Sequence, residues 1–448
     1  MSAPATLRLT TVEQEMLDGA HGSAVAMAMR IVAGVARAHG AQRLLEIESA
    51  HVDGGLYHGR AGLEFARRLA DQGGQVAVRT TTNVGSLDLL HPELVRADNE
   101  LREGARALME AYRQLGCEPT WSCAPYQLSH RPKRGAHVAW AESNAIAFAN
   151  SVLGARTERY GDFLDICAAL TGRVPDAGLH QDEARQARVV IDFSGVSAEL
   201  LAHDAAWPAM GALVGEIAGT RVAALTGLSG DIHDDLGDDL ADGLGRATED
   251  RLKALGATAA STGGVALFHV IGVTPEAPTL DAVVAAAAPA ADDPDDVIDT
   301  VAITTADVRA ARDRLSTGRA GRLDAVALGT PHFSVGEFAA LAAAIGDGPV
   351  FADSVEVYVS TSRAVLEVAR AAGTLAVVEQ AGARIVTDTC TYVTPVLRAS
   401  ATNVMTNSGK WAWYAPGNIG ADAVLGTLSE CVASARAGTV VRDDRLWS

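Results

Sequence analysis

Residues 43–83 read RLLEIESAHVDGGLYHGRAGLEFARRLADQGGQVAVRTTTN and give the clearest indication of the fold class. The apolar run at residues 43–50 predicts a buried strand that ends in a polar loop at residues 51–55. A helical pattern follows over residues 61–71, and residues 75–79 predict a second strand after two glycines. Short apolar strands that alternate with helices are typical of an α/β fold.

The same alternation continues toward both ends of the chain. Thr10 or Thr11, followed by Glu13 or Gln14, predicts a capped helix start. Further helices are expected at residues 16–38, 93–115, 139–150, 162–170 and 198–202. Further strands are expected at residues 189–193, 324–329, 350–352, 375–378 and 384–388. We therefore predict an α/β protein throughout.

The length and composition set limits on organisation. A chain of 448 residues is too long for one ordinary core, so residues 1–448 should form two or three α/β lobes. Residues 282–297 (AVVAAAAPAADDPDDV) are low in complexity and predict a surface connection. Residues 227–245 are acidic and rich in glycine, which predicts a loop with a short helix.

The net charge of −18 makes nucleic acid and anionic lipid improbable partners. The N-terminal residues lack the basic and apolar segments of a signal peptide, and no apolar run is long enough to predict a membrane span. Five cysteines, an odd and low number, argue for a reducing compartment. The cytoplasm is the expected location.

Several polar segments follow predicted strands or flank helices, which is where α/β folds place their ligands. Together they suggest one converging polar site. These segments are residues 51–57, 80–83, 122–126, 142–144, 150–151, 330–334, 388–390 and 407–410.

Two cysteines stand out by their surroundings. Cys123 and Cys390 lie among polar loop residues, which fits metal ligation or catalysis, although either can also be a plain loop cysteine. Cys167 lies in an apolar helical run, and it and Cys117 are expected to fill core space. Because the chain has no C-x-x-C pair, a metal site would need cysteines from distant segments.

Other patterns leave their alternatives open. His332 can act as a base or can be a loop histidine with a hydrogen-bonding role. The acidic residues 231–238 can bind a cation, but a solvated acidic face is the commoner case. Ser143 lacks a G-x-S-x-G frame, so a hydrolase nucleophile is unsupported. A cysteine-nucleophile enzyme using Cys123 and His332, or a non-catalytic scaffold subunit, also remains possible.

Seven strings in order make the chain resemble the aconitase X family, and the weaker similarity around them extends this resemblance over nearly its whole length. The strings are SCAPY at 122–126, GAHVAWAESNA at 135–145, FANSVLGART at 148–157, ALTGRVP at 169–175, GTPHFS at 329–334, TDTC at 387–390 and NSGK at 407–410. The resemblance implies an aconitase-like, multi-lobed α/β/α catalytic domain. It also implies an iron-dependent hydro-lyase.

The family has two branches, which resemble cis-3-hydroxy-L-proline dehydratase and the large subunit of phosphomevalonate dehydratase. Thr330, and the stretch at residues 407–417, resemble the hydroxyproline branch. That resemblance implies dehydration of cis-3-hydroxy-L-proline to 1-pyrroline-2-carboxylate. Because the family's small swivelling domain has no counterpart here, a separate small subunit is the expected partner.

The resemblance also implies roles for particular residues. It implies that iron or an iron–sulfur cluster, [2Fe-2S] or [4Fe-4S], is held by Cys123 and Cys390, with Cys431 as the candidate third ligand. Three ligands would leave a position open for the substrate hydroxyl. The candidate catalytic residues are Ser143 as base, Glu142 and His332. The candidate substrate-binding residues are Gly54, Gly55, Asn83, Asn144, Arg156, Ser408 and Lys410.

Overall fold

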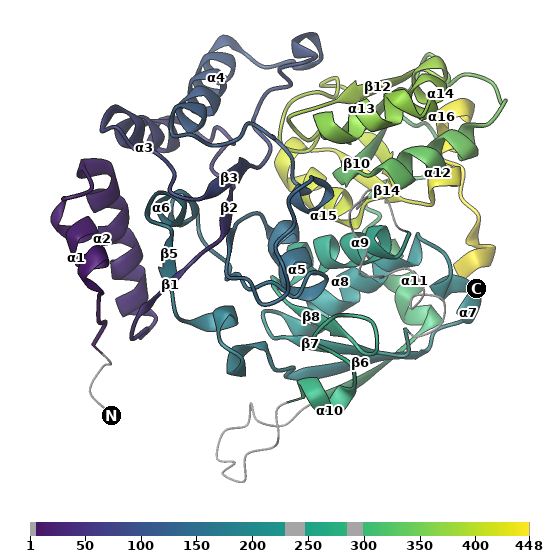
Figure 1. Ribbon diagram of the computed structural model, residues 1–448. Coiled ribbons are helices and arrows are strands. Elements are labelled where there is room, and N and C mark those ends of the chain that lie inside the picture. Colours follow the sequence, from purple (N-terminus) through teal and green to yellow (C-terminus); the bar gives the residue numbers. More distant parts are fainter. Residues whose placement is uncertain (1–5, 229–246, 285–298, 448) are drawn as a thin grey trace.

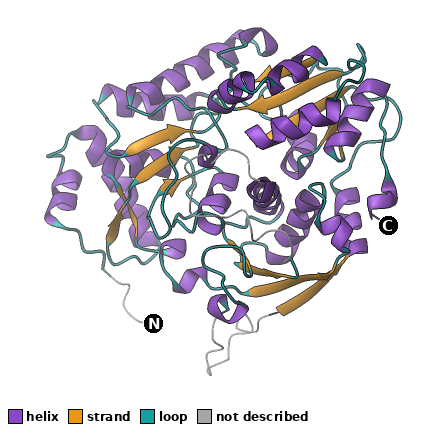
Figure 2. Cartoon of the chain, turned by 45° about the vertical axis from the view of Figure 1, so that its right-hand side comes forward, coloured by secondary structure: helices purple, strands orange, loops and turns teal. Residues whose placement is uncertain are grey.

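The computed structural model describes residues 6–228, 247–284 and 299–447. Its strands form three parallel sheets and one short antiparallel pair, with helices around them (Figures 1 and 2). The prediction of an α/β fold is therefore confirmed. The predicted connection at 282–297 lies almost wholly outside the described residues, and so do the acidic residues 231–238.

The first lobe holds the sheet β3-β2-β4, whose strands are parallel, and the antiparallel pair β1-β5. Helices α2 and α6 pack together beside these strands. The elements are α1 (Thr11–Asp18), α2 (Ser23–Ala38), β1 (Leu44–Glu46), β2 (Ser49–Val52), α3 (Arg60–Asp71), β3 (Arg79–Thr82), α4 (Asn99–Gln114), β4 (Ala139–Trp140), α5 (Ser143–Ser151), α6 (Leu164–Thr171) and β5 (Arg173–Pro175).

The second lobe is built on the parallel sheet β8-β7-β6-β9. Helix α8 is buried along most of its length and packs against α9, so this pair forms the centre of the largest apolar core. The elements are β6 (Val189–Gly195), α7 (Ala198–Leu201), α8 (Ala206–Ala218), β7 (Ala223–Thr226), α9 (Ala247–Thr262), β8 (Phe268–Val270), α10 (Leu280–Val283), β9 (Asp299–Thr304) and α11 (Thr305–Arg314).

The third lobe holds the parallel sheet β12-β11-β10-β13-β14. All nine residues of β10 are buried, as expected for a central parallel strand with both faces covered. The elements are β10 (Ala325–Phe333), α12 (Val335–Ile345), β11 (Glu356–Thr361), α13 (Arg363–Ala371), α14 (Thr374–Gln380), β12 (Ala383–Val386), β13 (Asn403–Thr406), α15 (Gly409–Ile419), β14 (Asp422–Leu425) and α16 (Leu428–Ala437).

Short 3-10 turns complete the described chain. They are η1 (Pro92–Leu94), η2 (Pro125–Gln127), η3 (Gly178–His180), η4 (Glu183–Arg185) and η7 (Asp444–Trp447). No single helix among the described residues is long and apolar enough to cross a membrane. Helices α1 and α2 pass such a test only as a pair, and they are bent by 117° relative to each other.

The capped helix start was predicted correctly, since Thr10 and Glu13 form a reciprocal capping box on α1. Several other boundaries were wrong. Residues 75–78 do not form a strand, because Val76 and Ala77 donate to the carbonyls of Leu115 and Ala169 at helix ends.

The predicted strand at residues 375–378 is part of helix α14. Its two buried residues, Leu375 and Val378, are three positions apart and face the core from one side of a helix. Residues 350–352 are not a strand either, and Phe351 donates to the carbonyl of Ala381. The helix predicted at 139–150 begins only at Ser143, because Ala139 and Trp140 form β4.

Candidate active site

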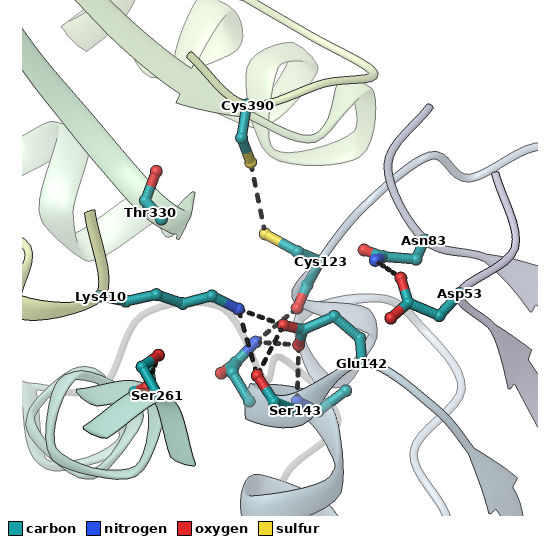
Figure 3. Close-up of polar contacts among 12 residues, drawn as sticks. Asp53, Asn83, Cys123, Glu142, Ser143, Ser261, Thr330, Cys390 and Lys410 are labelled. Atoms are coloured by element: carbon teal, nitrogen blue, oxygen red, sulfur yellow. Dashed lines mark hydrogen bonds and ion pairs between the residues drawn. The ribbon is translucent and has the colours of Figure 1, made fainter. Parts of the chain in front are cut away.

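The three lobes meet around a cluster of polar and sulfur-bearing side chains (Figure 3). Cys123 comes from the loop between α4 and β4 in the first lobe, and Cys390 follows β12 in the third. Their sulfur atoms lie 3.9 Å apart although 267 positions separate them in the chain. The structure therefore brings together the two cysteines that the sequence singles out.

This pair fits a shared metal ion. Two sulfurs on one tetrahedral metal, each about 2.3 Å from it, lie about 3.8 Å apart, and the observed separation is 3.9 Å. A disulfide would need about 2.05 Å, and both cysteines are free. Both are buried, 4% and 1% exposed, although they lie in polar loops.

His332 is the third member of this cluster. One donor atom each from Cys123, His332 and Cys390 lie within 4.8 Å of one another, and among the described residues this is the only such group of three or more. The His332 backbone N–H also donates to the Cys123 sulfur at 3.2 Å. This hydrogen bond stabilises negative charge on the sulfur, which favours a thiolate ligand.

The ring of His332 is already held on both sides. Its Nε2 lies 3.1 Å from the Thr389 carbonyl oxygen, so Nε2 carries the hydrogen and donates. Its Nδ1 then accepts from the Ser122 hydroxyl at 3.3 Å. Burial lowers the pKa of His332 to about 4. A neutral ring with both nitrogens in hydrogen bonds is a weak base. This argues against an enzyme in which His332 activates Cys123 as a nucleophile.

The structure does not bring Cys431 to this group. Cys431 lies on α16, 1% exposed, inside the apolar core of the third lobe. Thr330, on β10, is drawn above Lys410, on the side of the cluster away from Asp53 (Figure 3). Its hydroxyl oxygen is buried and has no hydrogen-bond partner in residues 6–228, 247–284 and 299–447. The structure therefore does not support Cys431 as the third ligand.

A buried ion pair lies directly below the cysteines (Figure 3). The Lys410 ammonium, at the start of α15, donates to Glu142 Oε1, and both side chains are buried. Glu142 Oε2 accepts from Asn144 and from the Ala145 backbone N–H, both at 2.8 Å, so it caps α5. Asn144 in turn donates to the Cys123 carbonyl at 2.6 Å, which links the ion pair to the cysteine loop.

Glu142 and Lys410 each stabilise the charged form of the other. Burial alone raises the pKa of Glu142, but the Lys410 ammonium and the hydrogen bonds outweigh burial and the net pKa is lowered. Burial lowers the pKa of Lys410, and the Glu142 carboxylate raises it well above its ordinary value. The Ser143 hydroxyl lies 3.4 Å from Glu142 Oε1 and 3.5 Å from Lys410 Nζ. Ser143 is thus in contact with an acceptor and a cation.

On the opposite side of Cys123, Asn83 donates to Asp53 (Figure 3). Gly54 and Gly55 follow Asp53, and neither position has room for a side chain. A Cβ on Gly54 would lie 1.8 Å from the Tyr112 hydroxyl, and one on Gly55 would lie 3.0 Å from the Val84 carbonyl oxygen. The two glycines therefore have a packing role that lets the loop approach the site.

Two further candidates have structural contacts instead. Arg156 donates to the His180 carbonyl and to Asp182, within the first lobe, and is not among the side chains around the cysteines. Ser408 caps α15 and donates to the Thr330 carbonyl. Asp53 was missed by the sequence reading, although its position just after a strand, inside a polar loop already noted, was an available signal.

A cavity of about 390 Å³ opens between the second and third lobes next to this site. Its walls include Thr330, Ser408 and the buried Lys253, whose ammonium is paired with Asp250 and Glu337. The cavity is large enough for a small organic acid, and it borders the site at Thr330.

Together, the fold and the site define a three-lobed α/β protein with a potential thiol-based metal centre where its lobes meet. The chain belongs to the aconitase X family, whose first, second and third domain models match residues 6–183, 187–313 and 323–437. The crystal structure of Thermococcus kodakaraensis aconitase X (holo-form) is similar, with a TM-score of 0.80 and 32% identity over 96% of this chain and 100% of that chain.

Named relatives come from both expected branches. The chain is 42% identical to the cis-3-hydroxy-L-proline dehydratase of Pseudomonas aeruginosa, over 96% of this chain and 70% of that protein. It is 37% identical to the enzyme of the same name from Hypocrea jecorina, over 96% and 69%. It is 36% identical to the phosphomevalonate dehydratase large subunit of Methanothermobacter thermautotrophicus, over 93% and 96%. These relatives are dehydratases, so a carbon–oxygen lyase is the supported enzyme class.

Proposed function

We propose that this chain is the catalytic part of an iron-dependent hydro-lyase that converts cis-3-hydroxy-L-proline to 1-pyrroline-2-carboxylate. The observation that carries the choice of substrate is the 42% identity to a cis-3-hydroxy-L-proline dehydratase over 433 residues. The phosphomevalonate dehydratase large subunits are 36% identical or less, and they provide the second candidate substrate.

The reaction removes the proton alpha to the carboxylate and the hydroxyl at C3. The Ser143 hydroxyl is the proposed base, because it can pass its own proton to Glu142 while Lys410 stabilises the oxygen that remains. In the part of the chain that the structure describes, the Lys410 ammonium donates to Glu142 and Ser143, which leaves its third N–H for the substrate carboxylate. A cation there lowers the cost of burying that anion. The first product is an enamine, which tautomerises to the imine.

Cys123 and Cys390 are the proposed iron ligands. The candidates for a third are Thr330, and His332 through Nδ1 if the Ser122 hydroxyl turns away from it. When bound there with a position open, iron would act as a Lewis acid on the leaving hydroxyl. The thiol separation of 3.9 Å supports a shared metal, whether a single iron or a cluster.

We also propose a separate small subunit that covers this site. The chain spans 96% of one phosphomevalonate dehydratase large subunit but only 70% of a hydroxyproline dehydratase. The matched region therefore has the extent of a large subunit. The further part of the hydroxyproline enzymes would correspond to the small partner.

The test uses protein reconstituted with iron under anaerobic conditions, with and without a candidate small subunit. We expect 1-pyrroline-2-carboxylate from cis-3-hydroxy-L-proline and no dehydration of phosphomevalonate. Turnover of phosphomevalonate alone would favour the second candidate. Absence of bound metal and of lyase activity, even with the partner, would favour a scaffold role.

A further inference from the structure

The structure contains a second carboxyl group at the site whose role is still open, that of Asp53. It lies in the loop after β2, and its backbone N–H donates to the buried carboxylate of Asp165 at 2.7 Å. Its Oδ1 accepts from the Asn83 side-chain amide. Its Oδ2 has no hydrogen-bond partner in the part of the chain that the structure describes, and the side chain stays partly accessible. One oxygen is thus fixed and the other is free to act.

The surroundings of Asp53 favour its protonated form. Burial is the largest influence, followed by the charge of Glu142, and smaller contributions come from Asp165 and Asp162. The Asn83 hydrogen bond opposes them, and the net effect raises the pKa of Asp53 to about 8. Tyr112, whose hydroxyl lies against this loop at Gly54, also has its pKa raised well above the ordinary value by burial, so it stays neutral.

Asp53 and Glu142 therefore occupy opposite electrostatic environments within one site. Glu142 is paired with a lysine and has a lowered pKa, whereas Asp53 faces other acids and has a raised one. When two carboxyl groups in one site have such different pKa values, one can accept a proton and the other can donate one. A dehydration needs both, because the hydroxide that leaves must gain a proton.

Asn83 supplies an independent indication of a ligand. Its side chain is 2% exposed, and its Oδ1 is buried and has no hydrogen-bond partner among the described residues. Such an orphaned acceptor is costly unless a ligand donates to it. A substrate hydroxyl can donate to Asn83 Oδ1 and accept from Asp53 Oδ2 at the same time. The two side chains, already bonded to each other, form a receptor for one hydroxyl group.

We propose that Asp53 is the general acid of the dehydration and that Asn83 positions the leaving hydroxyl against it. This inference rests on the proposed function. As the C3–O bond breaks, its electron pair goes to the oxygen, the Asp53 proton joins that oxygen, and water leaves. The electrons of the Cα–H bond form the new Cα–C3 double bond. Asp53 ends the step as a carboxylate and regains its proton from solvent.

The first test compares two leaving groups. Asp53→Asn should reduce kcat on cis-3-hydroxy-L-proline by about 10²–10⁴-fold, but should leave elimination from cis-3-chloro-L-proline within a few-fold, because chloride leaves without a proton. Ser143→Ala, which removes the proposed base, should slow both substrates. Equal losses on the two substrates in Asp53→Asn, or no loss on the hydroxy substrate, would overturn the general-acid role.

The second test uses the pH profile. The wild-type kcat/KM should fall as pH rises through about 8, where Asp53 loses its proton, and Asp53→Asn should lack this limb. Asp162 is exposed, and its negative charge raises the pKa of Asp53. Asp162→Asn should therefore move the alkaline limb of the pH profile to lower pH and retain the maximal rate. An alkaline limb that stays in place in both variants would contradict the assignment.

A third measurement separates this inference from the proposed function. In infrared spectra at pH 7, wild-type protein should show a protonated-carboxyl band that Asp53→Asn lacks, whichever substrate the enzyme uses. Wild-type protein that shows the band but neither dehydrates hydroxyproline nor eliminates chloride from its chloro analogue would count against the proposed function alone. Absence of the band would overturn the proton-donor role of Asp53.

Discussion

Three residues beside the site hold backbone conformations that side chains with a Cβ rarely adopt. Trp121, Glu142 and Asp388 have φ angles of 41°, 71° and 62°. Each costs about 1–3 kcal/mol and persists only where the surroundings fix it. Each also lies one or two positions before a proposed functional residue, namely Cys123, Ser143 or Cys390. The strained backbone positions therefore lie where the chain turns to place the side chains of the site.

The cysteine pair gives the first prediction. Cys123→Ser and Cys390→Ser should each reduce bound iron to background and abolish lyase activity, because one thiolate cannot hold the metal alone. Far-UV circular dichroism should be unchanged. Metal analysis after anaerobic reconstitution measures the effect. Cys431→Ala is the matched control, since this buried cysteine lies away from the site and its variant should keep its iron. Full iron in Cys123→Ser would exclude that ligand.

The buried ion pair gives a second prediction. Lys410→Met leaves Glu142 charged and unpaired inside the protein, which should cost about 3–5 kcal/mol of unfolding free energy near neutral pH. In that variant burial raises the pKa of Glu142 above its unfolded value. The loss should therefore shrink as pH falls and Glu142 takes up a proton.

Urea unfolding of Lys410→Met, Glu142→Gln and the double variant measures this coupling. We expect the double variant to recover part of the stability, since it removes the unpaired charge. Additive losses in the two single variants would mean that the pair is not coupled.

At the scale of elements, the sequence predicted the helices better than the strands. Helix α3 was expected at residues 61–71 and is found at Arg60–Asp71, because its apolar positions recur with helical spacing. Strand β10 was expected to end near residue 329 but continues to Phe333. A register shift between Leu328 and Phe333 lets it pair again with β11, and such an irregularity leaves no mark in the hydrophobic pattern.

Strand β2 gives a prediction about acid stability. His51 is wholly buried, and burial lowers its pKa to about 4 from an ordinary value of 6.5. Between these pH values the unfolded chain binds a proton that the folded chain excludes. The contribution of His51 is therefore fully present above pH 6.5 and is lost as pH falls toward 4, by up to about 3 kcal/mol.

His51→Asn removes the titration and retains a polar atom to pair with Thr81. The free energy of unfolding should fall less steeply for this variant than for wild type between pH 6.5 and 4. Denaturant titrations across that range provide the comparison. Parallel pH profiles for the two proteins would show that His51 is not the group responsible.

At the scale of the whole molecule, the sequence could indicate which loops are polar but not how they meet. Cys123 and Cys390 were chosen correctly as neighbours, whereas Arg156 and Cys431 were grouped with them and lie elsewhere. The difference arises from lobe packing, which no local pattern encodes. Asp53 was overlooked because its raised pKa comes first from burial and then from the charge of Glu142, a partner 89 positions away, and only the fold creates both.

Contacts between the first and third lobes hold the two cysteines in place. Asp88 is 1% exposed and accepts from the backbone N–H and the hydroxyl of Thr387 at 2.8 and 2.9 Å. The Gly85 N–H donates to the Asp388 carbonyl at 2.8 Å, two positions before Cys390. Residues 85–89 and 387–388 thus form a clamp between the two lobes, and we expect the spacing of the thiols to depend on it.

Asp88→Ala should loosen this clamp without changing any proposed ligand. It leaves two buried donors of Thr387 unsatisfied, at about 1–3 kcal/mol each, so the third lobe should separate more readily from the first. We expect a clear loss of bound iron and faster alkylation of Cys390 in the metal-free protein. Arg96→Ala removes an ion pair to Glu356 that joins the same lobes, but Arg96 is exposed and its loss should have little effect. Unchanged iron content and unchanged thiol protection in Asp88→Ala would mean that the sulfur separation is set within each lobe's loop and not by the contact between the lobes.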